Sequence, residues 1–190
     1  MEPFKENIID AFRVIDRKDF VLKEYENEAY EDIPLPIGFG QTISQPTTVA
    51  LMLELLQPQK GNKILDIGSG SGWTTALLAQ IVGKEGKVFG VEKITQLVSF
   101  GKENLEKYHF FNVEIRKAGK ELGLKKEAPF DRILVSAAAQ FIPQKLVEQL
   151  KIGGIMVMPV NNSLLRIEKI SNKKIKLQRL KGFVFVPLVK

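Results

Sequence analysis

The chain contains no cysteine and only one histidine, His109, among its 190 residues. The lack of cysteine excludes disulfide bonds, thiolate nucleophiles and cysteine-ligated metals, and a single imidazole cannot build a histidine-rich metal site. We therefore predict no metal-binding residues. His109 lies in the segment Lys-Tyr-His-Phe-Phe of residues 107–111, where we expect a surface or half-buried loop residue and not a catalytic base.

Long apolar runs are also missing. No apolar stretch approaches the ~18 residues of a membrane span. The N-terminal segment Met-Glu-Pro-Phe-Lys-Glu has neither the basic start nor the apolar core of a signal peptide. The sequence therefore predicts a cytoplasmic protein without membrane contact. A chain of 190 residues with 44% hydrophobic side chains suits a single domain, and we expect a monomer.

The net charge is +6, and the lysines are dispersed along the chain except in residues 169–181, Lys-Ile-Ser-Asn-Lys-Lys-Ile-Lys-Leu-Gln-Arg-Leu-Lys. Apolar and basic residues alternate there, which is typical of a half-exposed strand with its basic side chains in water. We expect Ile170, Ile175, Leu177 and Leu180 to face inwards. This interpretation favours a solvated sheet face over a nucleic-acid-binding patch.

An apolar strand runs into a glycine-rich loop at residues 64–72, Ile-Leu-Asp-Ile-Gly-Ser-Gly-Ser-Gly. Gly68, Gly70 and Gly72 allow sharp turns and the close approach of a ligand, and free N–H groups of the following helix would face that ligand. The spacing is not the Gly-x-Gly-x-x-Gly that accommodates a pyrophosphate, and no Gly-Lys-Ser/Thr follows. A cofactor without phosphates fits best, of which S-adenosyl-L-methionine (SAM) is the common one. The alternative is an ordinary strand-to-helix turn.

Glu92 ends the next predicted strand, Val-Phe-Gly-Val-Glu. An acid about 20 residues beyond a glycine loop is placed to accept hydrogen bonds from both ribose hydroxyls of a nucleoside. Ser69, Ser71 and Trp73 carry weaker claims to the cofactor. Hydroxyls at a helix N-terminus are often caps, and we expect Trp73 to pack in the core and not to stack on adenine.

The order of the predicted elements indicates an α/β fold. Strands are expected at residues 63–67, 87–91, 113–116, 130–136 and 154–159, and helices at 5–17, 46–56, 74–82, 95–108 and 143–150, with a loop at 19–36. Alternating helices and apolar strands predict a doubly wound, mostly parallel sheet covered on both faces, the Rossmann-like architecture usual for SAM methyltransferases. Two or three further strands between residues 164 and 188 have no helices between them, so they must form an antiparallel C-terminal hairpin.

The domain prediction is a single methyltransferase domain over residues 1–190. Residues 1–57 form an N-terminal helical and substrate-loop extension, residues 58–160 the SAM-binding core, and residues 161–190 the C-terminal antiparallel strands.

The segment at residues 33–46, Ile-Pro-Leu-Pro-Ile-Gly-Phe-Gly-Gln-Thr-Ile-Ser-Gln-Pro, closely resembles the signature of the protein-L-isoaspartate O-methyltransferases. Other marks of that family occur in order at residues 17–21, 29–32, 128–131, 137–139, 142–143, 153–154, 158–159 and 185–188. The resemblance implies a protein-repair enzyme that methylates the L-isoaspartyl carboxylate of aged proteins and peptides. The ester then closes to a succinimide that partly reopens to aspartate.

The resemblance also implies the acceptor site. It places Ser44 at the active site beside the transferred methyl group, with Thr42 and Ile43 shaping the same turn, and it adds Ala137 to the substrate contacts. A carboxylate with a pKa of about 4 is already ionised at neutral pH, so Ser44 would orient it and no general base is needed. Alternatively, Thr42 and Ser44 cap the helix that begins at Pro46, and both roles can coexist.

For the cofactor, the resemblance implies residues around the glycine loop and after the third strand. The predicted set is Asp66, Gly68, Ser69, Gly70, Gly72, Glu92 and Gly119. Tyr30 and Asp32 match a family segment near the peptide groove, or they pack within their own loop.

One departure from the family lies at Ala118-Gly119-Lys120, where Gly-Asp-Gly is usual and its aspartate region contacts adenine. Either Glu121 or a backbone carbonyl replaces the acid, or SAM binds more weakly and the chain is a catalytically weakened SAM-binding homologue. A nucleic-acid methyltransferase of the same fold is a further alternative. It is disfavoured because the small residues at 137–139 can neither hydrogen-bond a base edge nor stack on a flipped base.

Overall fold

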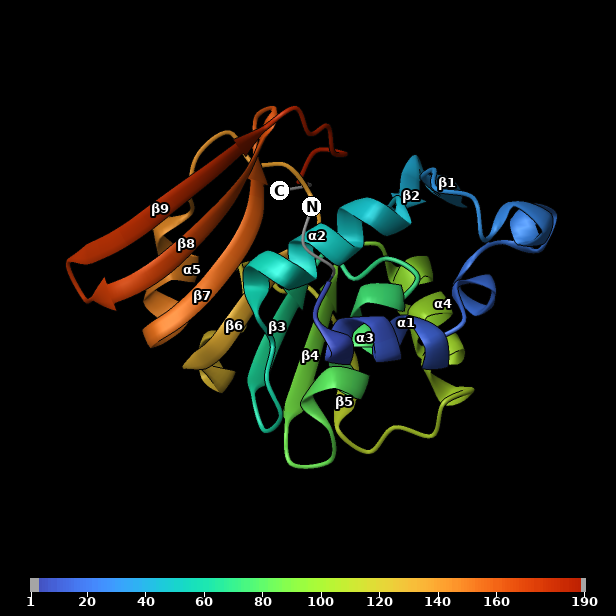
Figure 1. The fold of residues 1–190 in the computed structure, drawn as a ribbon, viewed down its shortest axis with the longest axis horizontal. Helices are drawn as coiled ribbons and strands as arrows, with labels where there is room; N and C mark the ends of the chain where they lie inside the picture. Colours follow the sequence, from blue (N-terminus) through green and yellow to red (C-terminus); the bar gives the residue numbers. More distant parts are fainter. Residues whose placement is uncertain (1–3, 189–190) are drawn as a thin grey trace.

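The computed structural model describes residues 4–188 as a seven-stranded sheet flanked by helices, with a separate two-stranded hairpin (Figure 1). The helices are α1 Glu6–Val14, α2 Pro46–Leu56, α3 Trp73–Val82, α4 Thr95–Glu106 and α5 Gln144–Gln149, with 3₁₀ turns η1 Arg17–Phe20, η2 Lys23–Glu28 and η3 Lys125–Glu127. The strands are β1 Leu35–Gly38, β2 Gln41–Ile43, β3 Lys63–Ile67, β4 Lys87–Glu92, β5 Val113–Lys117, β6 Phe130–Val135, β7 Leu150–Val160, β8 Ser163–Ser171 and β9 Lys174–Lys181. Each helix and strand predicted between residues 46 and 160 is present. None of the helices in residues 4–188 combines the length and apolar character needed to cross a membrane.

The strand order in the large sheet is β5-β4-β3-β6-β7-β8-β9. The first five strands in this order, from β5 to β7, run parallel. Strands β8 and β9 are antiparallel to their neighbours, which confirms the predicted doubly wound sheet with a C-terminal hairpin. The chain builds outwards from β3 to β5 and then returns to place β6 on the other side of β3. Such a reversal creates a crevice at the carboxyl ends of the strands, where ligands bind in open α/β sheets.

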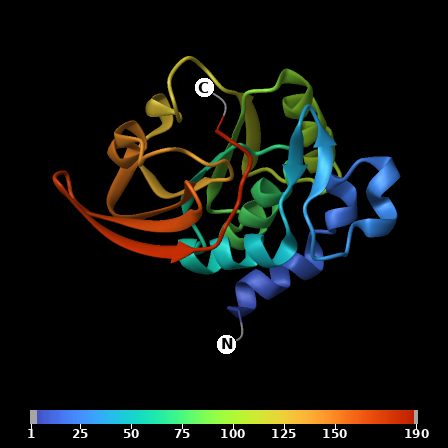
Figure 2. The ribbon, with the colours of Figure 1, turned by 90° about the horizontal axis from the view of Figure 1, so that it is seen from above.

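Both faces of the sheet are covered by apolar packing. In β3, Ile64 belongs to a buried cluster with residues of α1, α2, α3 and α4, whereas Leu65 and Ile67 belong to a second cluster with residues of α5. Figure 2 shows α2 and α5 on opposite sides of the sheet. A strand buried on both faces needs apolar residues at successive positions, which explains the continuous apolar pattern of β3 and β4.

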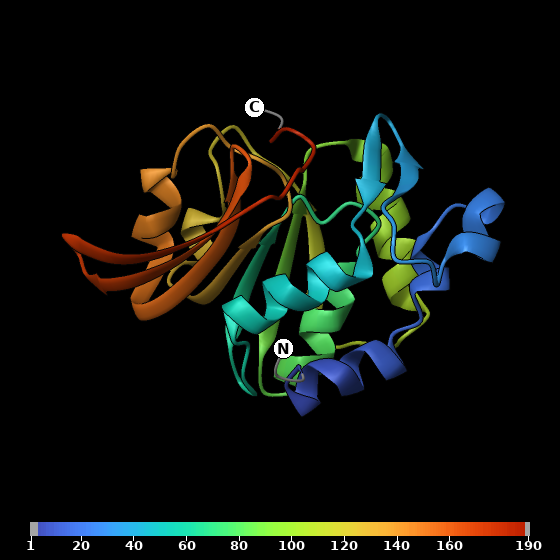
Figure 3. The same cartoon turned by 45° about the horizontal axis from the view of Figure 1, so that its top comes forward.

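Two segments from opposite ends of the chain lie above the carboxyl edge of the parallel strands. The β1–β2 hairpin stands at one side of this edge, and the segment that follows β9 crosses toward it from the other side (Figure 3). A backbone bridge joins Ala138, just after β6, to Pro187 in this last segment. Part of the loop predicted at residues 19–36 is in fact η2 and the start of β1.

The C-terminal basic segment forms strands with most of its basic residues exposed, as predicted, but the expected inward orientation of Ile170, Ile175 and Leu177 is wrong. Ile170, Ile175 and Leu177 are 40%, 38% and 45% exposed, while Lys169 is buried. The Nζ atom of Lys169 donates a hydrogen bond to the Leu150 carbonyl at 2.8 Å. The physical reason is position, because β9 is the outermost strand and extends beyond the helices that cover the rest of the sheet (Figure 1). Its lysines protect an exposed sheet edge from pairing with other chains.

Candidate functional site

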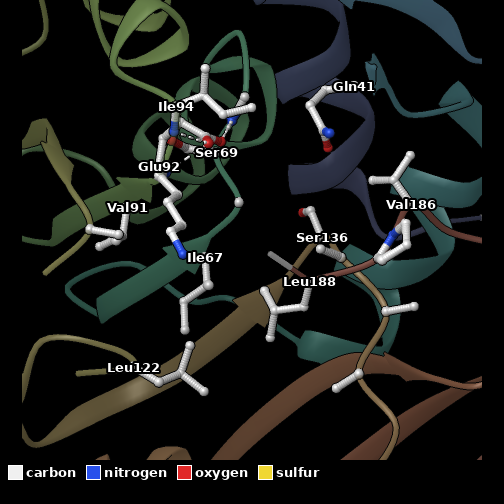
Figure 4. A pocket seen from close by; sticks show the side chains of 18 of the residues that line it. Gln41, Ile67, Ser69, Val91, Glu92, Ile94, Leu122, Ser136, Val186 and Leu188 are labelled. Carbon is white, nitrogen blue, oxygen red and sulfur yellow. Dashed lines mark hydrogen bonds between the residues drawn. The ribbon is translucent and has the colours of Figure 1, made fainter. Parts of the chain in front are cut away.

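A cavity of about 490 Å³ opens at the carboxyl edge of the sheet, at the crevice that the strand order creates. This volume lies in the range of small-molecule sites in proteins. Most of its lining comes from residues 41–44, 67–71, 91–94, 118–123, 136–141 and 186–188. We call residues 67–71 and 91–94 the glycine-loop wall, and residues 41–44, 136–139 and 186–188 the hairpin wall. Figure 4 shows Ser69 and Glu92 of the first wall on one side, with Gln41, Ser136 and Val186 of the second on the other.

The loop between β3 and α3 has the backbone that its glycines predict. Gly68, Gly70 and Gly72 have φ angles of 77°, 52° and 90°, in the left-handed region that side chains disfavour. A Cβ atom on Gly72 would lie 3.0 Å from the Gly101 carbonyl oxygen. Gly68 and Gly70 line the cavity, whereas Gly72 is outside its lining and allows the backbone before α3 to approach Gly101 of α4.

Glu92 lines the cavity and also holds the glycine loop. Its Oε2 atom accepts a hydrogen bond from the Gly70 amide at 3.0 Å, and its Oε1 atom accepts from Lys93 and Ile94 amides at 2.7 and 2.9 Å. The side chain is buried. A carboxylate offers about four acceptor positions, so these three bonds leave capacity for a ligand hydroxyl.

Asp66 lies behind the loop, outside the lining of the cavity. Its Oδ2 atom accepts hydrogen bonds from the Thr74 and Thr75 hydroxyls at 2.8 and 2.7 Å, and its Oδ1 atom is buried without a partner among the described residues. Complete burial raises the pKa of Asp66 to about 6, although both hydroxyls act in the opposite direction. The structure therefore gives Asp66 the position of a support for the first turn of α3.

The hairpin wall contains the residues predicted for the acceptor. Thr42, Ile43 and Ser44 all line the cavity, with Ile43 buried, Ser44 half-buried and Thr42 exposed. Ala137 is also in the lining, beside Gly68. The two predicted halves of the site, acceptor and cofactor, thus face one cavity.

Asp32 supplies the N-terminal cap of α2. The sequence had placed this residue either near the peptide groove or in packing within its own loop. Asp32 accepts hydrogen bonds from the amide and the hydroxyl of Thr47, both at 2.8 Å. Hydrogen bonds from this amide and this hydroxyl lower the pKa of Asp32. Asp32 thereby satisfies the free N–H group at the start of the helix, the role that the cap hypothesis gave to Thr42 or Ser44.

Tyr30 and His109 lie outside the cavity, whereas Trp73 lies partly in its lining. Tyr30 is exposed and donates its hydroxyl hydrogen to Asp16 at 3.0 Å. His109 is an exposed residue just after α4, which confirms its prediction as a loop residue. Trp73 packs edge-to-face against Phe12, with ring centroids 5.5 Å apart, and one part of it lines the cavity.

Sequence reasoning missed several lining residues. Ser136 follows β6 in the hairpin wall, and Val186 and Leu188 complete that wall (Figure 4). Amide hydrogen bonds of 2.8 Å join Ala138 to Val186 and Leu188 to Ala138. No local pattern marks these residues, although the family segments at 137–139 and 185–188 pointed to this region.

The loop that departs from the family also lines the cavity, from Ala118 to Gly123. Its far end is held by the buried side chain of Gln149, which accepts a hydrogen bond from the Leu124 amide at 2.8 Å and donates one to the Leu122 carbonyl at 3.0 Å. Gly123 has a φ of 85°, and a Cβ atom there would lie 2.4 Å from the Gln149 Oε1 atom. This glycine was the available sequence signal for the contact.

Three polar atoms in lining residues have no hydrogen-bond partner within residues 4–188. They are Ser69 Oγ, Ser136 Oγ and Trp73 Nε1. Buried polar atoms in native proteins normally have partners, so unpaired ones around a cavity indicate a ligand with polar groups. Together with the glycine-shaped loop, these atoms fit a polar nucleoside cofactor such as SAM.

Comparison with known proteins gives one consistent family. A family profile described as protein-L-isoaspartate(D-aspartate) O-methyltransferase matches residues 4–190. A protein-L-isoaspartate O-methyltransferase of Methanothrix thermoacetophila is 43% identical over 187 residues, which cover 97% of this chain and 88% of the relative.

Two solved structures of the same description have the same fold. One, from Plasmodium falciparum and in complex with S-adenosyl-L-homocysteine, has a TM-score of 0.86 at 28% identity, covering 97% of this chain and 91% of the other. A second has a TM-score of 0.90 at 27% identity, covering 98% of this chain. This chain spans 62% of that second structure.

Proposed function

The chain belongs to the protein-L-isoaspartate(D-aspartate) O-methyltransferase family, and from that premise we propose that it methylates L-isoaspartyl residues in aged proteins and peptides. The methyl group comes from SAM, and the acceptor is the free isoaspartyl carboxylate. The resulting ester starts repair, because it closes to a succinimide that partly reopens to aspartate. The observation that carries the proposal is that the glycine loop and the Thr42–Ser44 segment line one cavity.

Residues of the glycine-loop wall would hold the cofactor. The backbone at Gly68 and Gly70 leaves room for close approach, and Glu92 has acceptor capacity for ribose hydroxyls. The buried Ser69 hydroxyl has no partner in the described part of the chain. Gly119 would contribute backbone close to Glu92, whose carbonyl accepts a hydrogen bond from the neighbouring Ala118 amide at 2.7 Å. When bound, SAM supplies a methyl group on a positively charged sulfur, which makes that carbon open to attack by an anionic oxygen.

Residues of the hairpin wall would orient the acceptor. A carboxylate is ionised at neutral pH, so catalysis needs position and exclusion of water and not a proton acceptor. Ser44 can donate its hydroxyl hydrogen to a carboxylate oxygen, while Ile43 and Ala137 supply apolar surface that keeps water away. A positioned reaction of this kind can gain several kcal/mol from orientation alone.

The nucleic-acid alternative has little support in the structure. The basic strand β9 is at the far edge of the sheet, and its residues are outside the cavity lining. The wall that would meet a base consists of Ala137, Ala138 and Ala139, which offer no side-chain hydrogen bonds or stacking surface.

We further propose that the protein acts in the cytoplasm as a monomer. The support comes from the composition, because a chain without cysteine cannot form the disulfide bonds that are common in secreted proteins. Sedimentation at micromolar concentration tests the monomer, and a mass of two chains would contradict it.

The deciding experiment is transfer of radiolabelled methyl groups from SAM to an L-isoaspartyl peptide and to its L-aspartyl twin. We expect label in the isoaspartyl peptide alone. Equal labelling of both peptides would contradict the proposed specificity. If neither is labelled while S-adenosyl-L-homocysteine binds in calorimetry, the chain is the catalytically weakened homologue.

A further inference from the structure

The side chain of Arg17 is buried among backbone carbonyl groups. It is 5% exposed and lies in η1, far in sequence from the hairpin wall. Its Nη1 atom donates to the carbonyls of Ala29 and Glu31 at 2.8 and 3.2 Å. Its Nη2 atom donates to the carbonyls of Ile33 and Ser44 at 2.8 and 3.1 Å. One guanidinium thus joins four carbonyls along residues 29–44.

This arrangement differs from that of an arginine paired with carboxylates. Arg116, by comparison, forms ion pairs of 2.8 Å with Glu114 and Glu127 at a partly exposed site. Arg17 instead loses solvent, which lowers its pKa to about 10, and the charge of Asp32 offsets only part of this effect. Burial of a charge that only carbonyls contact lowers the stability of the fold, so we expect Arg17 to serve a purpose other than stability.

The second contact of Arg17 is with Trp73, two residues after the glycine-loop wall. Its guanidinium carbon lies 5.2 Å from the centre of the Trp73 ring. Trp73 begins α3, immediately after the glycine loop, and lines the cavity. Arg17 therefore contacts the backbone of Ser44 on one side and the first residue of α3 on the other.

We propose that Arg17 is a positioning residue that fixes Ser44 relative to Trp73 and the adjoining glycine-loop wall. The planar guanidinium presents several N–H donors in fixed directions, which a lysine ammonium cannot reproduce at four carbonyls. Loss of these bonds would leave residues 29–33 and Ser44 free to shift relative to Trp73. This inference rests on the proposed function of Ser44 as the residue that orients the acceptor carboxylate.

The test compares Arg17→Lys with Arg132→Lys. Arg132 serves as the control, because it is half-buried and, like Arg17, donates to backbone carbonyls, those of Gln57 and Asp131 at 3.1 and 2.8 Å, outside the cavity. We expect Arg17→Lys to lower kcat for the isoaspartyl peptide about 100-fold, as a displacement of ~1 Å does in well-oriented reactions. Affinity for S-adenosyl-L-homocysteine should change less than about threefold, and Arg132→Lys should leave both unchanged.

Amide hydrogen exchange supplies a second readout that does not need activity. Arg17→Lys should speed exchange in residues 41–45 and leave residues 63–67 as in the unmodified protein. If the unmodified protein does not methylate the peptide, the proposed function fails and exchange alone decides whether Arg17 holds Ser44. Unchanged exchange at 41–45 would overturn the inference. So would equal losses of kcat in Arg17→Lys and Arg132→Lys, which would reveal a stability effect only.

Discussion

The two walls of the cavity are built in different ways. The glycine-loop wall belongs to one continuous β3–loop–α3–β4 unit, whose shape depends on positive-φ glycines and on the bonds that Glu92 accepts. The hairpin wall brings together residues 41–44, 136–139 and 186–188 from three distant parts of the chain. On the proposed assignment, most of the cofactor contacts come from one βαβ unit, whereas the acceptor contacts depend on long-range packing.

If this division is correct, substitutions in one wall should change one step of the reaction and leave the other intact. Titration calorimetry with S-adenosyl-L-homocysteine measures the first wall, and turnover at saturating SAM measures the second. A substitution that changes affinity and turnover equally would show that the two walls do not act separately.

The largest expected effect is that of Ser44→Ala on turnover. Loss of the hydroxyl that orients the acceptor should lower kcat about 100-fold, similar to the removal of one hydrogen-bond donor in other active sites. Affinity for S-adenosyl-L-homocysteine should stay within about twofold. The opposite-wall control is Ser69→Ala, which should weaken that affinity and lower kcat little. Equal losses of affinity and turnover in Ser44→Ala would indicate a structural role for Ser44.

The second effect concerns Glu92→Ala and S-adenosyl-L-homocysteine. Removal of a buried, charged acceptor should weaken binding by about 1–3 kcal/mol. Part of this loss comes from the loop, because the Gly70, Lys93 and Ile94 amides lose their common acceptor. Calorimetry measures the change directly. Glu114→Ala, which removes an acid of β5 paired with Arg116, should leave the affinity unchanged.

The third prediction concerns the pH dependence of stability at Asp66. Its folded pKa of about 6 lies above the unfolded value, so its stabilising effect is complete below about pH 4 and is lost as pH rises through about 6. The neutral side chain of Asp66→Asn removes this dependence. Between pH 4 and pH 7, the free energy of unfolding of the variant should therefore rise by about 2 kcal/mol relative to that of the unmodified protein.

Urea denaturation at a series of pH values measures this change. Asp131→Asn is a control of opposite sign. Burial opposes the shift, but hydrogen bonds from Lys151 and Lys63 lower the pKa of Asp131. That carboxylate thus stabilises the fold above its unfolded pKa, and its effect disappears as pH falls. A parallel pH profile for Asp66→Asn and the unmodified protein would show that folding does not raise the pKa of Asp66.

The smallest effect is expected at the loop that departs from the family. Glu121 lies in the cavity lining, so it can replace the missing acid at adenine. Glu121→Ala should then weaken SAM binding by about 1 kcal/mol, and the double change Ala118→Gly with Gly119→Asp should bring little. If only the double change acts, by tightening SAM binding, Glu121 has no such role. If neither variant changes the affinity, other groups hold adenine.

The fold was largely predictable, because its signals are local. Near-continuous apolar runs identified β3 and β4, Pro46 marked the start of α2, and the lack of helices after residue 160 identified the antiparallel end of the sheet. The error at β9 has a clear cause. Alternation shows that a strand has two unlike faces, but it does not show whether any helix covers either of them.

The candidate site was predictable to a different degree in each wall. Gly68, Gly70 and Glu92 were named from spacing alone, and Ser44 from a family resemblance, and all four line the cavity. Ser136 was missed because a lone serine after a strand has no distinguishing pattern.

The sequence by itself determined the conformation of the glycine loop, because only glycine adopts the positive φ angles of residues 68, 70 and 72 without strain. It also determined the parallel order of strands and helices, through the periodicity of apolar residues. Only the tertiary structure decided that Lys169 is buried while Leu177 is exposed. It alone placed the Arg17 guanidinium between Ser44 and Trp73. Burial and long-range hydrogen bonds depend on which segments meet in space, and no local pattern of residues carries that information.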